Sequence, residues 1–513
     1  MTVTTPTEAS TDDTVHRRRW AILAVVSLAV FVTVLDGTIV NVAIPTLSLE
    51  LAATTRQLQW IVDAYLLVFT GLLLAGGALG DRYGRRKMLL AGLGVFGVTS
   101  ALAGSVDSAG GLIAGRALMG IGAALIFPAT LAIITNVFRD PIERAKAIGI
   151  WSAVTGVAVA AGPVSGGWLL EHFWWGSIFF VNVPVVVAAL VATALIVPES
   201  KEAGAPRLDI GGIALSIAAI TTLVYSIIEA PEWGWLDTRT LAGFATAAVL
   251  LVLFVLWELR QAHPMLPVSI FRNLRFSAAS VSVTSAFFAL FGFIFLITQY
   301  FQLVKTYTPL QAGIRTLPVA AAIAVASIVA PRVVEWIGTA RVVATGLALM
   351  AVAFMWIGLS AQVDTSYLVI AGQMVVLGTG LGLTTAPATE SIMGSLSPDK
   401  AGIGSAVNDT TRELGGTLGV AIVGSVFSSL YIGTLDSVGG VFGSLSPELR
   451  DVTSESVGAA KAIAGQLGAD APAFLGQVNE AFLAGLHVGC FVCAGVAAVG
   501  AVFALRFIPA RAV

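Results

Sequence analysis

Long apolar stretches separated by short polar segments repeat along the whole chain. Fourteen of them are long enough to cross the roughly 30 Å hydrocarbon layer of a bilayer as a helix. Lipid offers the backbone no hydrogen-bond partner, so each of these spans must be helical. We therefore predict an all-α membrane protein whose spans cover residues 20–44, 60–79, 88–106, 112–136, 145–168, 177–197, 210–228, 239–258, 276–301, 311–334, 340–360, 366–390, 403–430 and 482–507.

Lysine and arginine gather in alternate connections between these spans. One set of connections is rich in them and includes Arg17–Arg19, Arg82–Lys87, Arg139–Lys146 and Arg272–Arg275. The other set is long in total but holds only Arg56, Arg239, Lys305, Arg450 and Lys461. Because positive residues favour the cytoplasmic side of a membrane, both termini are predicted to be cytoplasmic. Residues 1–19 then form a cytoplasmic tail ahead of an uncleaved first helix.

Composition agrees with a polytopic membrane protein and excludes several other classes. Of 513 residues, 57% are hydrophobic and 11% are charged, and the mean hydropathy is +0.90, whereas soluble proteins carry about 25% charged residues. A net charge of -2 gives no reason to expect a nucleic-acid partner. Cys490 and Cys493 fall in an apolar run with no second cysteine pair nearby, so we interpret them as packing residues rather than a metal or redox pair. No metal or cofactor is expected.

A weak internal sequence repeat suggests two related halves. Lys146-Ala147-Ile148-Gly149 opens span five, and Lys400-Ala401-Gly402-Ile403-Gly404 opens span thirteen, each followed by Ser-Ala-Val. We predict six helices in residues 20–197, two inserted linker helices in 198–260, and six helices in 261–513. The last part contains one long outer loop, 431–481. Residues 452–467 of that loop form either a short amphipathic helix or part of a solvated, partly disordered segment.

The connection after span two carries a specific motif. Residues 77–87 read G-x-L-x-D-R-x-G-R-R-K, which resembles the loop between the second and third helices of the major facilitator superfamily. The resemblance implies the major facilitator fold, with 14 helices arranged 6+2+6 and substrate bound between the halves. It also implies a conformational role for this loop, carried by Gly77, Asp81, Arg82, Gly84 and Arg85.

A lone acid lies within the first span. An intramembrane carboxyl is costly and is a functional candidate by default, so Asp36 is expected to exchange protons unless it only forms a structural pair. Residues 35–45 resemble the L-D-x-T-I-V-N-V-A-x-P signature of the fourteen-helix drug:proton antiporter family. Arg116 opens an R-x-x-x-G-x-G segment in span four that is similar to the arginine motif linked in that superfamily to proton transfer. Both residues lie near the outer ends of their spans, so we expect them to be able to reach each other.

Span five contains a proline and glycine motif. Gly162, Pro163, Gly166 and Gly167 are similar to the G-P-x-x-G-G motif of antiporters. Proline removes a helix hydrogen bond, and glycine permits close helix contact. The resemblance favours export over uptake, while generic small-residue packing is the alternative.

The second half carries its own charged residues within or beside the spans. Asp409 and Glu413 are four residues apart in span thirteen and share a helix face, and Arg412 is expected to be able to neutralise one of them. Glu390 ends span twelve on the same side. These acids either bind a cation or proton or form a salt-bridged gate.

Together these features predict a proton-coupled antiporter that exports hydrophobic, cationic drugs or dyes and confers antibiotic resistance. The chain has no Walker loop, so the proton gradient rather than ATP is the expected energy source. We expect a monomer in the cytoplasmic membrane whose partners are lipids, protons and small lipophilic molecules. Alternatives are a narrow exporter of a lipid, siderophore or amino acid, a transport-inactive sensor, and an intramembrane enzyme. The enzyme is disfavoured because the four histidines lack metal-ligand spacing.

Overall fold

A computed structural model describes residues 6–509 apart from 203–208, 262–263, 265 and 397–400. Parts of the predicted tail and linker, and Lys400 of the internal sequence repeat, therefore lie outside the described residues. Within the described part, fourteen helices are long and apolar enough to cross a membrane, which confirms the predicted all-α class and number of spans.

The first six spans are formed by α1 (Pro6–Glu50), α2 (Thr55–Tyr83), α3 (Arg85–Ala103), α4 (Ala109–Val137), α5 (Pro141–His172) and the broken pair α6 (Ser177–Phe180) and α7 (Asn182–Ile196). We call these helices the first half. The next two spans are α8 (Ile210–Trp233) and α9 (Thr238–Glu258), followed by the short η1 (Val268–Arg272).

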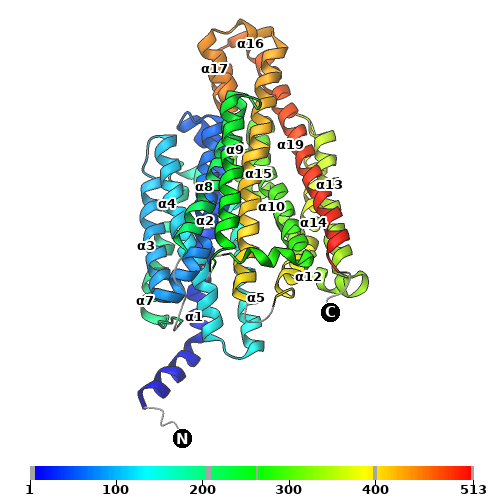
Figure 1. Cartoon of the computed structure of the whole chain (residues 1–513). Helices are drawn as coiled ribbons and strands as arrows, with labels where there is room; N and C mark the ends of the chain where they lie inside the picture. The colour runs from blue at the N-terminus through cyan, green and yellow to red at the C-terminus, as the bar shows by residue number, and fades with distance from the viewer. Residues whose placement is uncertain (1–5, 203–208, 262–263, 265, 397–400, 510–513) are drawn as a thin grey trace.

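The last six spans form the second half. They are α10 (Leu274–Gln299) with the π-turn η2 (Tyr300–Val304), α11 (Pro309–Arg315) with α12 (Leu317–Ile337), α13 (Thr339–Ser360), α14 (Tyr367–Met393), α15 (Ala401–Val438) and α19 (Ala471–Phe507). Helices α8 and α9 pack on each other, and α8 also contacts α2 and α15, so this pair lies beside the junction of the halves (Figure 1).

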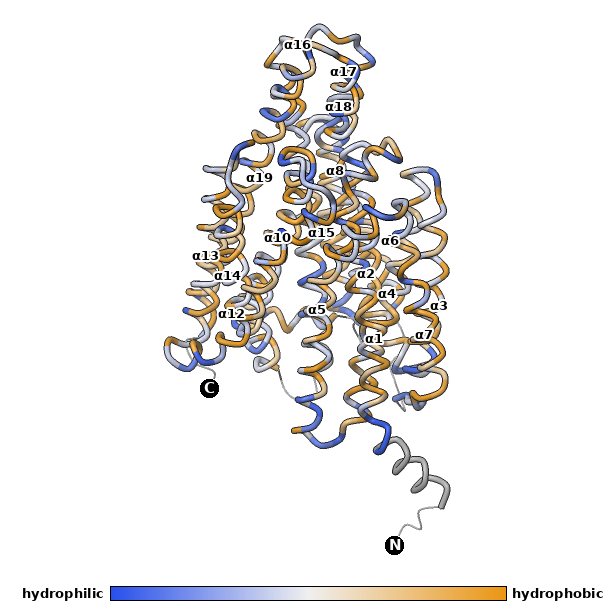
Figure 2. Tube along the Cα trace, turned by 180° about the vertical axis from the view of Figure 1, so that it is seen from behind, coloured by the Kyte–Doolittle hydropathy of each residue, from blue (hydrophilic) through white to orange (hydrophobic). Residues whose placement is uncertain are grey.

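Both chain termini lie at one end of the bundle, which we call the terminal end (Figure 1). Hydrophilic residues gather there at the base of α1 and α5, whereas the middle of the bundle is mainly hydrophobic (Figure 2). An even number of spans requires this placement. The side of the membrane that the terminal end faces stays a prediction from the charge bias.

The opposite end carries a small helical cap, residues 440–464, between α15 and α19. It contains α16 (Gly440–Ser444), α17 (Pro447–Glu455) and α18 (Val457–Ala464), and η4 (Gly468–Asp470) leads into α19. The prediction of a partly disordered segment is therefore wrong. The alternative of one helix over 452–467 is only partly right. Ser456 has an extended backbone that ends α17, and its hydroxyl accepts a hydrogen bond from the Ala459 amide at the start of α18.

The cap is attached to the bundle because its apolar residues pack against neighbouring helices. Val457, Ala460 and Ile463 are buried, and α18 packs against both α1 and α19. Tyr431 of α15 donates a hydrogen bond to the Thr453 carbonyl at 3.1 Å, which ties the cap to the second half. On its other side, the Ser456 and Ser48 hydroxyls lie 2.7 Å apart, so the cap also reaches the first half.

Further contacts join the two halves directly below the cap. Gln59 of α2 donates to the Ala421 carbonyl of α15 at 3.1 Å, and Gln302 donates to the Val42 carbonyl of α1 at 2.8 Å. The Leu310 amide donates to Glu171 at 3.1 Å. The halves are therefore closed against each other at the cap end.

Candidate functional site

Asp36 and Arg116 form an ion pair in the interior of the first half. Asp36 has no exposed surface and Arg116 is 1% exposed, so water does not screen the pair. The other carboxylate oxygen of Asp36 accepts a hydrogen bond from Asn182 at 2.8 Å. Asn182 reaches it because the break between α6 and α7 places this residue at the start of α7. The expected contact between Asp36 and Arg116 is present, and their role in proton transfer stays a prediction.

Arg116 has two further partners, both on α2. Its Nε donates to the Ile61 carbonyl at 3.1 Å, and its guanidinium carbon lies 4.2 Å from the centre of the Tyr65 ring. Tyr65 is itself buried, and its hydroxyl donates to the Thr33 carbonyl of α1 at 3.2 Å.

Asp63 is a buried acid that our sequence analysis missed. It is 0% exposed, and neither carboxylate oxygen has a hydrogen-bond partner among the described residues. It lies on the same face of α2 as Gln59, which bonds α15, and Leu67, which packs with Ala421 of α15. The signal was available in the sequence, because Asp63 lies within the predicted span 60–79 and is an intramembrane acid by the same criterion as Asp36.

The acids of α15 are arranged differently from the expected gate. Asp409 accepts only a long contact from Asn408 at 3.4 Å, and the Glu413 side chain accepts no hydrogen bond from the described residues. Arg412 instead donates to Thr389 of α14 at 3.3 Å and lies 5.4 Å from the centre of the Phe287 ring of α10.

The described part of the chain shows no ion pair between Arg412 and either acid, and the expectation that Arg412 can neutralise one of them stays a prediction. Glu413 is the next residue and points about 100° away from Arg412. Asp409 is three residues before Arg412 and is therefore close to it on the helix surface, but the guanidinium is directed at α14 and α10. Glu390 is exposed near the terminal end of α14, and its side chain takes part in none of the hydrogen bonds or ion pairs that the described residues form.

The loop between α2 and α3 is held by charge and by backbone. Arg85 donates two hydrogen bonds to Asp81, at 3.0 and 2.9 Å. Gly84 has a φ of 118°, which a residue with a side chain rarely adopts, and it forms the turn between the helices. The Glu199 carboxylate accepts a hydrogen bond from the Arg86 backbone amide at 3.2 Å, so the segment after α7 also contacts the loop.

The other two residues of this motif are less constrained. Arg82 is exposed and lies 5.6 Å from the centre of the Tyr83 ring. A side-chain carbon added at Gly77 would meet Pro128 at an ordinary 3.6 Å, so space alone does not require glycine there. The conformational role of the motif stays a prediction.

The α5 motif joins Asp36's helix to the second half. A side-chain carbon at Gly166 would lie 2.6 Å from Ile39, and Gly162 faces Thr38 just as closely. On the other side of α5, a carbon at Gly167 would lie 2.6 Å from Leu310, and Pro163 touches Gly313 of α11. Small residues are therefore required for α5 to fit between α1 and α11.

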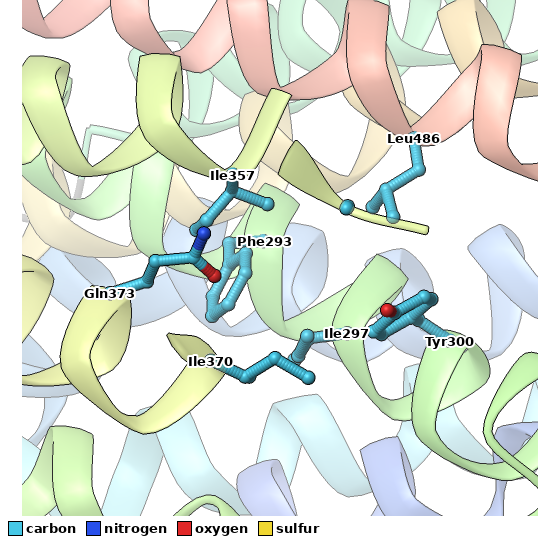
Figure 3. A pocket seen from close by; sticks show the side chains of 8 residues that line it. Phe293, Ile297, Tyr300, Ile357, Ile370, Gln373 and Leu486 are labelled. Atoms are coloured by element: carbon cyan, nitrogen blue, oxygen red, sulfur yellow. The ribbon is translucent and has the colours of Figure 1, made fainter. Parts of the chain in front are cut away.

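Two cavities differ greatly in size. The one in Figure 3 lies inside the second half, among Phe293, Tyr300, Gln373 and their neighbours, and its volume of about 10 Å³ suits one water molecule. The other has a volume of about 510 Å³, within the range of drug-sized sites. It lies toward the terminal end and is lined by Trp20, Leu23, Ala24, Ser27, Leu28 and Phe31 of α1 and by Ile150 and Val154 of α5.

Two six-helix groups that pack against each other, with charged residues buried within the spans, define the architecture of a membrane transporter. The sequence pattern of the Major Facilitator Superfamily matches residues 26–420, so the chain belongs to this superfamily. It is a multi-pass integral protein of the cytoplasmic membrane.

Several bacterial proteins are similar along most of the chain. The multidrug efflux pump LfrA of Mycolicibacterium smegmatis is 36% identical over 95% of this chain and 96% of its own. The methyl viologen resistance protein SmvA of Salmonella typhimurium is 36% identical over 81% of this chain and 83% of its own.

A solved structure supports the fold independently. The inward-facing, unoccupied crystal structure of a bacterial homologue of the human lysosomal transporter Spinster superposes with a TM-score of 0.68. It covers 96% of this chain and 97% of its own, and at 16% identity it supports the fold alone.

Proposed function

We propose that this protein exports hydrophobic cations across the cytoplasmic membrane in exchange for protons. Similarity to a multidrug efflux pump along nearly the whole chain supports drug export. The observation that carries the coupling is the set of acids within the spans, namely the buried Asp36 and Asp63 in the first half and the partly buried Asp409 and Glu413 in the second. Each can hold either a proton or, where a substrate reaches it, a positive charge.

Charge balance gives the exchange a physical basis. Asp36 and Arg116 together are neutral, and a proton on Asp36 leaves an uncompensated arginine in a dry interior. Asp63 differs because its charged form is the unbalanced one: among the described residues, no group donates a hydrogen bond to its carboxylate, so a proton on Asp63 removes an uncompensated buried charge. Moving the halves changes what each group contacts, so proton occupancy and conformation are linked.

The substrate class follows from the second half and the larger cavity. Among the described residues, neither Glu413 nor Asp409 accepts a hydrogen bond from Arg412, so each carboxylate can make a charge-assisted contact with a cation. The cavity of about 510 Å³ between α1 and α5 is lined almost entirely by apolar side chains, which suits the hydrophobic body of a drug.

A narrower exporter of a lipid, siderophore or amino acid would use the same fold, and a substrate panel separates it from a drug pump. We expect no catalytic activity and a monomer that works without a cofactor. An intramembrane enzyme or a transport-inactive sensor would not change drug accumulation in cells.

The test is ethidium accumulation in cells with and without the protein, each with and without a protonophore. Export that collapses with the protonophore is the expected result, and export that persists would exclude proton coupling.

Asp36→Asn tests the coupling at one residue. In everted vesicles it should express normally but lose proton-driven drug transport. Asp107→Asn, an exposed acid in the loop after α3, is the matched control and should transport as the unmodified protein does. Normal transport by Asp36→Asn would remove Asp36 from the mechanism.

A further inference from the structure

Arg116 is surrounded by more partners than an ion pair needs. Asp36 of α1 provides one, and α2 provides the Ile61 carbonyl at 3.1 Å and the Tyr65 ring at 4.2 Å. Ile61 and Tyr65 are four residues apart, so they lie on one face of α2 and approach the guanidinium together. At 1% exposure, Arg116 has no contact with bulk water that could replace any of these partners.

These partners respond differently to a proton. If Asp36 becomes neutral, it no longer balances the charge of the guanidinium. The carbonyl and the ring do not titrate, and attraction of a cation to an aromatic face is strongest where water is excluded. Arg116 therefore retains two partners on α2 when the first one is lost.

We propose that Tyr65 is a positioning residue whose ring, with the Ile61 carbonyl, forms a second seat for Arg116. The seat holds the buried arginine while Asp36 is neutral, so the ion pair can open and close without loss of the fold. The titratable and charged groups around this seat are Asp36 on α1, Tyr65 and Asp63 on α2, Arg116 on α4 and Glu413 on α15.

The seat also has a consequence for communication between the halves. Tyr65 is on the helix whose Gln59 bonds α15 and whose Asp63 is buried on the same face as Gln59. When Arg116 shifts its contacts from Asp36 toward Tyr65, the change is applied to α2 rather than to α1. This part of the inference rests on the proposed function.

A double-mutant cycle on thermal stability in detergent tests the seat without any transport measurement. Asp36→Asn mimics the neutral acid, Tyr65→Leu removes the ring, and Tyr65→Phe keeps the ring and removes the hydroxyl. We expect Asp36→Asn combined with Tyr65→Leu to lower the melting temperature by clearly more than the two single shifts added together. Asp36→Asn combined with Tyr65→Phe should be additive.

Tyr300→Leu provides a matched control. Tyr300 is 1% exposed and its hydroxyl donates to the Gln362 carbonyl at 2.6 Å, much as Tyr65 donates to Thr33, but it lies in the second half, away from Arg116. Its combination with Asp36→Asn should be additive. An additive Asp36→Asn and Tyr65→Leu pair, or equal behaviour of Tyr65→Leu and Tyr65→Phe, would overturn the proposal.

If the double variant cannot be purified, the single variants decide by the pH profile of transport. Without the ring, Arg116 depends more on Asp36, so Tyr65→Leu should need a more acidic pH for half-maximal drug-driven proton exchange, whereas Tyr65→Phe should keep the original profile. An unchanged profile in Tyr65→Leu would reject the seat. Failure of proton coupling in the unmodified protein would instead reject the proposed function and leave the stability cycle as a separate result.

Discussion

Replacing Gln59 by alanine should weaken the closure of the two halves at the cap end. The Gln59 amide lies near three acceptors of α15, namely the Ala421 carbonyl at 3.1 Å, the Ser425 hydroxyl at 3.3 Å and the Val420 carbonyl at 3.4 Å. An amide nitrogen has two hydrogens, so at most two of these bonds form at once. A typical net contribution is about 1 kcal/mol per bond, so the loss of one or two bonds costs about 1–2 kcal/mol.

A loss of this size changes a conformational ratio measurably. About 1–2 kcal/mol corresponds to roughly a 5- to 30-fold shift toward the state in which α2 and α15 separate at the cap end. The two acceptor carbonyls remain within the α15 helix, so the variant leaves them hydrogen-bonded inside their own helix. Gln59→Ala should therefore redistribute conformations without unfolding the protein.

Distance measurements between spin labels at residues 107 and 364 provide the assay. Both positions are exposed, and they lie in cap-end loops of different halves. Gln59→Ala should increase the population of long distances in the absence of substrate. Gln373→Ala is the matched control, because Gln373 is 2% exposed and donates to Ser360 at 2.8 Å within the second half. Unchanged distances in Gln59→Ala, or an equal change in Gln373→Ala, would refute the reasoning.

Three further predictions follow from contacts on other helices. Asp81→Asn removes the negative charge of the carboxylate that accepts both hydrogen bonds from Arg85, and it should slow conformational exchange while equilibrium drug binding stays nearly intact, as measured by label kinetics and dye titration; lost binding with unchanged kinetics would instead place the loop in the binding site. Glu413→Gln should reduce resistance to cationic compounds more than to matched neutral ones, and more than Asp409→Asn does, because Asp409 already has the Asn408 amide; an equal loss for both compound classes would indicate a structural role. In a background with Cys490 and Cys493 replaced, oxidation of a Ser48→Cys and Ser456→Cys pair should stop transport, and reduction should restore it; transport by the cross-linked pair would show that this contact need not open.

The membrane spans were predictable because lipid imposes one solution on an apolar chain. Hydropathy locates each helix to within a few turns, yet it does not locate the last hydrogen-bonded residue. Helix α15 continues to Val438 and α19 starts at Ala471, well beyond the apolar limits predicted at residues 430 and 482. These extensions are stabilised by contacts within the cap, such as Tyr431 with Thr453, which join residues far apart in sequence.

The candidate site was predictable where a motif carried it. Asp36 and Arg116 were selected as charged residues in apolar spans, and the helix arithmetic placed them at similar depth. Asn182 was visible in the sequence but not as a partner of Asp36, because its position depends on the break before α7. The contacts of Arg412 with α14 and α10 could not be predicted because they depend on helix packing, and Asp63 was overlooked although it lies within the predicted span 60–79.

The cap lies at the end of the long helix α15, so a small rotation of that helix displaces the cap by a larger distance. Helix α15 has 38 residues and is therefore about 57 Å long. If the second half rotates about a point near the middle of this helix, the attached end of the cap moves about 0.5 Å for each degree of rotation, a displacement set by the rise of 1.5 Å per residue. A fluorophore on an exposed cap residue such as Arg450 would magnify a small rotation in the membrane into a signal outside it, and would leave every buried residue untouched.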